Sequence, residues 1–252
     1  MPSSHHPFRR REAVAPLLLA ACAGLGLLAL GANARAEEAP PLSLSGSAAL
    51  TSDYVWRGST QTQGDAAVQA GFKAAHRSGF YASAWGSNVE FAPQTHASSE
   101  FDFTVGWAGK IADHWGLDVN VLHYRYPSTA VDLNWTELNG TATWRDRYWL
   151  SLAYSNRALG SQDRGLYSQV GARFPVNDAL RLEAAVGHYF LDDVYDRSYS
   201  HGQLSAIWAV KTASSANFEL RLTAHATDRD AERIFGDSLA GSRVEAALQA
   251  SF

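Results

Sequence analysis

The chain has 252 residues, of which 46% are hydrophobic and 18% are charged, and its formal net charge at pH 7 is −4. This composition is too apolar and too weakly charged for a disordered chain, and a pI near 6.1 excludes a strongly basic nucleic-acid binder. Only Lys73, Lys110 and Lys211 are lysines among its 21 basic residues, whereas soluble surfaces use lysine freely, which favours a surface that is not in water.

The first 36 residues have the features of a secretory signal peptide. Three arginines, Arg9–Arg11, precede an uncharged stretch that runs from residue 13 to residue 34. Ala34-Arg35-Ala36 is a cleavage site of the small-residue type. This order predicts export of the chain and removal of residues 1–36.

Two other uses of this segment stay open. The uncharged stretch is long enough for an uncleaved anchor helix, and Leu19-Ala20-Ala21-Cys22 resembles the processing site of a lipoprotein. Pro16 and the small-residue site weigh against the anchor, and the apolar residues that continue past Cys22 weigh against the lipoprotein. Cleavage leaves residues 37–252, which contain no cysteine, so the exported chain needs a source of stability other than disulfides.

Apolar and polar residues alternate along the mature chain, and the pattern recurs about every 18 residues. From Leu42 to Trp56 the even positions are mainly apolar and the odd positions mainly polar, which is typical of a strand. No window after residue 36 is apolar for 18 residues, which excludes transmembrane helices. Similar alternation predicts eleven more strands, near residues 68–74, 80–90, 101–107, 115–121, 137–145, 148–155, 166–174, 180–186, 199–210, 218–225 and 244–252.

The connections between these strands alternate in length. Short connections are expected at residues 76–79, 110–113, 145–147, 175–178 and 211–216, and the longest at 227–242. Short turns on one side and long loops on the other are the layout of an outer-membrane barrel, and strands of about ten residues cover its apolar band. We therefore predict an all-β fold, a transmembrane antiparallel up-and-down β-barrel of about twelve strands.

The alternation alone does not decide which face of the barrel points outward. A soluble barrel would turn the apolar face inward. The polar face, however, consists of Ser, Thr, Gly, Gln and Asn with arginines and carboxylates, which suits a hydrated interior crossed by charge-assisted hydrogen bonds. Aromatic residues near the predicted strand ends also fit membrane interfaces. They are Tyr54, Trp56, Trp107, Trp115, Trp144, Tyr148 and Phe174.

Several segments resemble the TorF-type family of proteobacterial porins. The most specific is Thr51-Ser52-Asp53-Tyr54-Val55-Trp56-Arg57-Gly58-Ser59-Thr60-Gln61-Thr62, in which Trp56 and Ser59 depart from the family's pattern. The other segments are 67–72, 79–81, 85–89, 100–102, 124–127 and 134–138. The resemblance implies an outer-membrane location and a pore function, which in that family is itself an assignment by likeness and does not establish transport.

Charged residues on the polar face are the candidates for facing the lumen. They are Asp53, Arg57, Lys73, Asp102, Glu137, Arg173, Arg181, Glu183, Glu219, Arg221 and Glu245. Asp53 and Arg57, four residues apart on the predicted first strand and so roughly 13 Å apart, cannot pair with each other. These residues could form a charged constriction that selects solutes, or they could bond neighbouring strands and fill the interior. Twelve strands lie between barrels filled by side chains and barrels filled by water, so both interpretations stay open.

Other chemistry has weaker support. Ser168 and His188 fall on the apolar face of adjacent predicted strands and could attack lipid esters, although no third residue is evident to orient the imidazole. Acidic residues gather near 192–196 and 228–232, where solvated loops are a simpler interpretation than a cation site. No Cys/His spacing predicts zinc, and no glycine-rich loop predicts a nucleotide site. We expect no enzyme activity, no cofactor and no metal.

The predicted function is passive diffusion of small polar solutes through a channel in the Gram-negative outer membrane. The alternatives are a non-conducting structural or surface-binding barrel and, less favoured, an outer-membrane esterase. Expected partners are the lipid bilayer with its lipopolysaccharide, small polar solutes and the outer-membrane assembly machinery, for which the terminal aromatic Phe252 would be the recognition signal. Nucleic acid is not an expected partner, and the sequence leaves the solute and the oligomeric state open.

Overall fold

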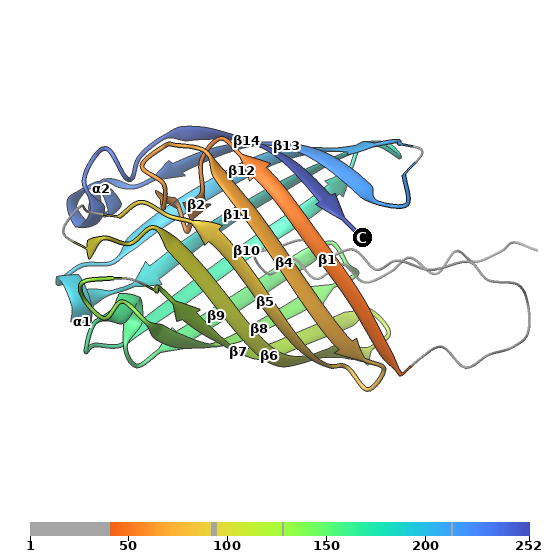
Figure 1. The fold of residues 1–252 in the computed structure, drawn as a ribbon, viewed down its shortest axis with the longest axis horizontal. Coiled ribbons are helices and arrows are strands. Elements are labelled where there is room, and N and C mark those ends of the chain that lie inside the picture. The colour runs from red at the N-terminus through yellow and green to blue at the C-terminus, as the bar shows by residue number, and fades with distance from the viewer. Residues whose placement is uncertain (1–40, 92–94, 128, 213) are drawn as a thin grey trace, which may run out of the picture.

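A computed structural model describes residues 41–91, 95–127, 129–212 and 214–252. In it, twelve antiparallel strands form a closed barrel (Figure 1). The barrel strands are β1 (Leu42–Thr51), β4 (Ala67–His76), β5 (Phe80–Asn88), β6 (Ser99–Ala112), β7 (Trp115–Arg125), β8 (Trp135–Trp144), β9 (Tyr148–Ser155), β10 (Gly165–Pro175), β11 (Leu180–Phe190), β12 (Tyr199–Val210), β13 (Asn217–Thr227) and β14 (Arg243–Ser251). The predicted all-β, twelve-stranded barrel is therefore confirmed.

The barrel closes between its first and last strands. Ala48 lies opposite Ala250 in the β1–β14 register. Beyond this ladder, Gly46 and Phe252 exchange two backbone hydrogen bonds of 2.7 and 3.0 Å. A Cβ atom on Gly46 would lie 2.6 Å from the Phe252 ring, so the ring covers a position where only glycine leaves room. Closure pairs both edge strands, which an open sheet would leave exposed.

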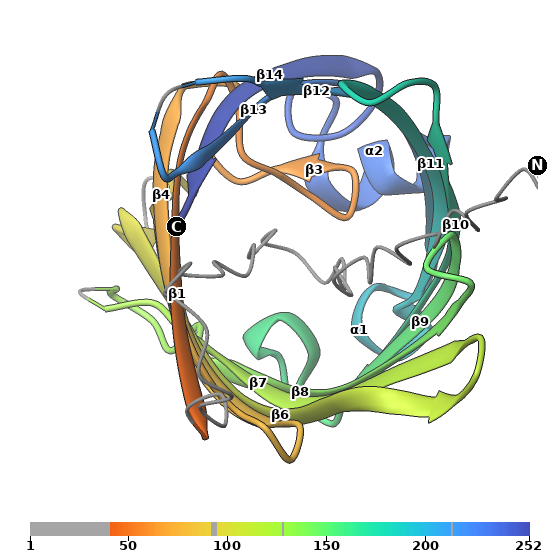
Figure 2. The same ribbon diagram turned by 90° about the vertical axis from the view of Figure 1, so that its right-hand side faces the viewer.

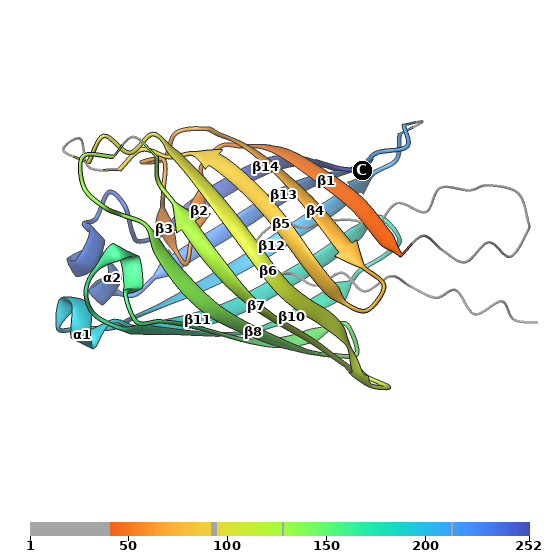
Figure 3. The same ribbon diagram turned by 60° about the horizontal axis from the view of Figure 1, so that its bottom comes forward.

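The two ends of the barrel differ in the way predicted. One end carries the short turns, such as 145–147 between β8 and β9 and 176–179 between β10 and β11. The other end carries the long loops, with the 3₁₀ turn η2 (Ala158–Gly160) and the helices α1 (Asp192–Tyr195) and α2 (Arg229–Phe235). Figures 1 and 3 show both α-helices at this loop end.

The apolar face of the strands points outward. Val68 and Leu222 are 68% and 55% exposed, whereas Thr223, next along β13, is 2% exposed. Among the described residues, no helix is long and apolar enough to span a membrane. The prediction that the apolar side chains cover the outside of the barrel and the polar ones its interior is therefore confirmed, and such a surface matches a lipid environment.

The first strand is shorter than predicted. It ends at Thr51, and the chain then turns into the barrel as a hairpin of β2 (Val55–Trp56) and β3 (Ser59–Thr60). Figure 2, which looks along the barrel, shows β3 inside the ring of strands. The two central residues of this hairpin, Arg57 and Gly58, have positive φ values of 46° and 85°, which a type I′ hairpin turn requires. The alternation persisted through this segment because hairpin arms are extended too.

This inner hairpin, residues 53–62, changes the predicted set of interface aromatics. Trp56 packs against Tyr124 and Tyr189 inside the barrel, so placing Tyr54 and Trp56 in the outer girdle was wrong. Elsewhere, rings do gather on the turn end of the wall, where Trp144, Tyr148 and Phe174 contact one another in sequence.

Candidate functional site

Four segments that are far apart in the sequence meet inside the loop end of the barrel. They are 51–62, 100–102, 124–127 and 134–138. Arg57 of the inner hairpin bonds Glu137 of β8, and Tyr54 of the hairpin bonds Glu100 of β6. These are the segments that carried much of the resemblance described above, and their meeting marks this region as the candidate site.

The Arg57–Glu137 pair is the centre of the site. Two guanidinium nitrogens of Arg57 donate to the two carboxylate oxygens of Glu137, each over 2.8 Å. The side chains are only 9% and 1% exposed, and the Tyr124 hydroxyl donates to Glu137 Oε2 over 3.0 Å. Burial opposes the charge of Arg57, but the Glu137 carboxylate prevails and raises the pKa of Arg57 above its usual value. The pair is a bidentate, charge-assisted contact closed to water.

Aromatic rings enclose the same guanidinium. Its Cζ atom lies 4.0 Å from the ring centre of Tyr167, 4.2 Å from that of Trp56 and 4.8 Å from that of Tyr189, all within cation–π range. The Tyr199 hydroxyl donates to the backbone oxygen of Arg57 over 3.0 Å. The tip of the inner hairpin is thus held by β10, β11 and β12 as well as by β8.

Asp53 ties the base of the inner hairpin to β14, the strand next to β1. Its Oδ2 atom accepts from Arg243 of β14 over 3.1 Å, and its Oδ1 atom accepts from the hydroxyls of Thr60 and Thr62. Asp53 and Arg57, which the sequence predicted could not pair with each other, are each bonded to a different strand. The hairpin is therefore fixed at both ends inside the barrel.

Glu100 and Asp102 lie on the same face of β6, and their position in the barrel leaves them without a basic partner among the described residues. Glu100 is 1% exposed, and its Oε1 atom accepts from Tyr54 over 3.2 Å. Glu100 Oε2 and Asp102 Oδ1 are buried and have no hydrogen-bond partner there. Asp102 was a sequence candidate. Glu100 was missed, although its parity places it on the same face.

A second charged cluster lies toward the turn end on β10, β11 and β13. Glu183 Oε1 accepts from Arg173 over 2.7 Å and from Arg181 over 3.1 Å. Arg181 also donates to both oxygens of Glu219 over 2.5 and 2.9 Å, and Arg221 lies 3.8 Å from Glu183. This Arg–Glu cluster brings five sequence candidates together, and its arginines are about a fifth to a quarter exposed.

The two remaining candidates have local partners. The Lys73 ammonium lies 3.7 Å from the ring centre of Tyr81, whose hydroxyl donates to Asp118 over 2.8 Å. Glu245 Oε2 lies 3.0 Å from His225 Nε2. Neither candidate belongs to the Arg–Glu cluster or bonds the Arg57–Glu137 pair.

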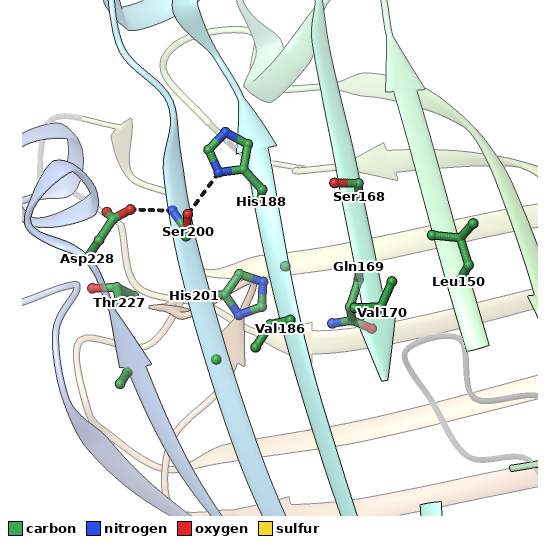
Figure 4. Close-up of a pocket in the computed structure, with 13 residues that line it drawn as sticks. Leu150, Ser168, Gln169, Val170, Val186, His188, Ser200, His201, Thr227 and Asp228 are labelled. Atoms are coloured by element: carbon green, nitrogen blue, oxygen red, sulfur yellow. Dashed lines mark hydrogen bonds between the residues drawn. The ribbon is translucent and has the colours of Figure 1, made fainter. Parts of the chain in front are cut away.

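In the structure, His188 contacts a different serine from the one in the serine–histidine hypothesis. Ser168 lies opposite His188 in the register, but His188 Nδ1 is 2.9 Å from Ser200 Oγ, as Figure 4 shows. Asp228 accepts from the Ser200 backbone nitrogen over 2.7 Å. These residues line an outer-face groove of about 600 Å³, and among the described residues no carboxylate bonds the His188 ring to orient it.

The acidic loop residues have structural partners. Asp193 pairs with Arg164 over 2.6 Å, and Asp230 pairs with Arg233 over 2.8 Å. Asp228 accepts from the backbone nitrogens of residues 230 and 231 and so caps α2. Within the described part of the chain, no group of three or more His, Cys, Asp or Glu side chains is arranged to hold a metal ion.

Comparison with protein families gives one match, which spans almost all of the barrel. Residues 35–250 match the model of a family described as "Bacterial protein of unknown function (Gcw_chp)". The chain belongs to the Gcw_chp family. No curated protein matches it, and the description of the family assigns no activity.

Solved structures share the fold of this Gcw_chp protein at very low sequence identity. The "KdgM porin in complex with disordered oligogalacturonate" has a TM-score of 0.51 and 6% identity, over 83% of this chain and 97% of that one. The NanC porin has a TM-score of 0.51 and 12% identity, over 83% and 99%. At such identities the likeness shows the fold alone, a closed antiparallel β-barrel.

Proposed function

We propose that this Gcw_chp protein is an outer-membrane channel through which small polar solutes diffuse passively. The observation that carries the proposal is a closed barrel with an apolar outer face and a charged interior. Closure satisfies every backbone group in lipid, and the charged interior gives polar solutes an environment that lipid does not. The fold shared with the KdgM and NanC porins and the resemblance to TorF-type porins support this function.

Export and assembly complete the proposal. Residues 1–36 would direct the chain out of the cytoplasm and be removed; they lie outside the described residues. Phe252, which is 51% exposed and bonded to Gly46 at the closing seam, would be recognised by the outer-membrane assembly machinery. The mature barrel would contact phospholipid on one side of the membrane and lipopolysaccharide on the other.

The interior divides the channel into two zones with different roles. At the loop end, the inner hairpin and the nearly water-free Arg57–Glu137 pair would form the narrowest part and limit solute size. At the turn end, the partly exposed Arg–Glu cluster would meet solutes directly. Its three arginines outnumber its two glutamates, so it would favour anions modestly.

Planar-bilayer recording tests the proposal. Purified protein, shown to be folded by its heat-dependent gel shift, is expected to give unitary conductance steps. Arg181→Gln should move the reversal potential in a salt gradient toward cation preference, and the matched Glu219→Gln should move it toward anion preference, because each removes one lumenal charge. Absence of unitary steps from folded protein would overturn the channel.

One observation favours a second candidate, a non-conducting structural barrel. The tip of the inner hairpin is buried and bonded to four strands, which is also the expected arrangement of a permanent plug. The two candidates differ in what releasing the hairpin does. A channel conducts in the wild type and conducts more when the hairpin is freed, whereas a plugged barrel is silent in the wild type and conducts only when the hairpin is freed.

A further inference from the structure

Acidic residues inside the barrel differ sharply in how their charge is balanced. Asp53 faces Arg243, Glu137 faces Arg57 and Glu183 faces Arg173. Glu100 and Asp102 face no basic side chain among the described residues, and Arg57 of the hairpin is paired with both carboxylate oxygens of Glu137. An unpaired carboxylate in a buried position is unfavourable, so the charge of this pair must be neutralised by a proton or by a cation.

The geometry of the pair offers carboxylate oxygens as ligands in a buried place. Two residues apart on one strand, the side chains point to the same side of β6, and the two carboxylates interact with each other. Glu100 Oε2 and Asp102 Oδ1 are buried and accept no hydrogen bond from the residues that the structure describes, and Glu100 is 1% exposed. These two oxygens are an observation separate from the acidic character of the pair, because both are buried without a hydrogen bond from a described residue.

The hydroxyl groups of Tyr54 and Tyr126, which come from two different loops, interact with the Glu100–Asp102 pair. Burial, the larger cause, and then the charges of Glu100 and Asp102 raise the pKa of both Tyr54 and Tyr126 above the usual value. Both hydroxyls thus stay neutral and lie within the electrostatic reach of the carboxylates. Tyr54 belongs to the inner hairpin, and its hydroxyl already bonds Glu100.

We propose that Glu100 and Asp102, with the hydroxyls of Tyr54 and Tyr126 and with water, bind a calcium ion inside the barrel. Carboxylate, hydroxyl and water oxygens are the ligands of hard cations, and two carboxylates balance a divalent charge. Calcium tolerates irregular coordination, whereas magnesium requires near-ideal octahedral geometry. The absence of His or Cys ligands from this set argues against zinc.

The site would also couple the ion to the inner hairpin. Tyr54 links the hairpin to Glu100, so an ion held by β6 would help to keep the hairpin seated. Binding does not depend on whether the barrel conducts, because the ligands come from the wall and the hairpin alone. Ion binding and conductance can therefore fail or succeed separately.

Terbium luminescence and calorimetry test the site in the complete mature protein. The chain is refolded in detergent and freed of divalent ions with a chelator. Terbium, a trivalent probe of calcium sites, should then emit under excitation of the nearby tyrosines. Calcium should displace it, and calorimetry should show one calcium ion bound per barrel. Asp102→Asn and Glu100→Gln should abolish both results, while the matched loop variant Asp193→Asn should keep them.

Tyr54→Phe provides a variant that keeps both carboxylates and is expected to fold. It should weaken calcium binding by about 10- to 100-fold, as loss of a supporting group does at other metal sites. Folding of every variant is checked by the heat-dependent gel shift. The proposal is overturned if folded wild type binds no calcium, which would mean that a proton alone neutralises the pair. It is equally overturned if terbium emission survives Asp102→Asn but is lost in Asp193→Asn, which would place the ion in the loops.

Discussion

Arg57 brings a permanent charge into a part of the barrel that is almost closed to water. Its stability there depends on Glu137, with which it forms two hydrogen bonds of 2.8 Å, and on the rings of Trp56, Tyr167 and Tyr189. In such a site the loss of one partner costs more than the loss of both, because the remaining charge is left buried and unpaired.

Single and double substitutions of this pair should therefore be strongly non-additive. Arg57→Met is expected to destabilise the folded barrel by about 3–5 kcal/mol, since Glu137 is then unpaired, and Arg57→Met/Glu137→Leu should recover most of that loss. Urea unfolding in lipid vesicles, followed by tryptophan fluorescence, measures all three free energies. If the two single changes simply add in the double variant, the pair does not organise the interior as described.

For single residues, the sequence predicted which side chains face the interior better than it predicted which side chains they bond. Parity placed Arg173, Arg181 and Glu183 on the interior face, and the structure joins them in one cluster. It could not predict that Arg57 would bond Glu137, 80 residues further on, because the partner of a loop residue depends on how the loop folds. Glu100 was missed because it lies just before the predicted strand 101–107, whereas β6 begins at Ser99.

The inner hairpin is the element that distinguishes this barrel from a simple cylinder. Its seating depends on Gly58, whose φ is +85°, and where a Cβ atom would lie 2.7 Å from His201 Cβ and from Thr227 Cγ2. Gly64 has a similar φ of +89° but no heavy atom within 4 Å of that position. An alanine at either position would have a strained backbone conformation, but only at position 58 would its Cβ atom also meet neighbouring side chains.

Gly58→Ala should consequently release the hairpin, and Gly64→Ala should not. Trypsin cleaves after arginine, so a released hairpin becomes cleavable at Arg57, while the wild type stays resistant there. Limited proteolysis of the refolded protein, read by mass spectrometry, gives the result directly. Equal resistance of both variants at Arg57 would show that this contact does not seat the hairpin.

The inner hairpin also shows where a strand prediction from alternating apolar and polar residues fails. Alternation predicted one strand from Leu42 to Trp56, but the ladder ends at Thr51. Strands and hairpin arms are both extended, so their side chains alternate alike, and only the backbone reversal at Arg57-Gly58 separates them. The usual Asn-Gly or Asp-Gly sequence of such a turn is absent here.

The whole molecule was more predictable than its interior. Twelve strands, a loop end and a turn end followed from alternation and connection lengths, because a barrel in lipid requires an apolar outer face on every strand. What fills the bore does not follow from that requirement. A hairpin folded inward and a water-filled lumen satisfy the same outer pattern, so the inner hairpin is visible only in the structure.

The central claim is a barrel that is apolar toward lipid and polar within, and paired cysteines on β14 test it most directly. Ala246 is exposed on the outer face and Ala247 is partly buried on the inner face, and the proposed mature chain has no cysteine of its own. In protein refolded into vesicles, Ala247→Cys should react with a water-soluble maleimide, whereas Ala246→Cys should resist it and, once labelled with a fluorophore before refolding, be quenched by brominated lipid. The reverse pattern, or equal reactivity of both cysteines in a protein that stays folded in buffer without detergent or lipid, would contradict the account.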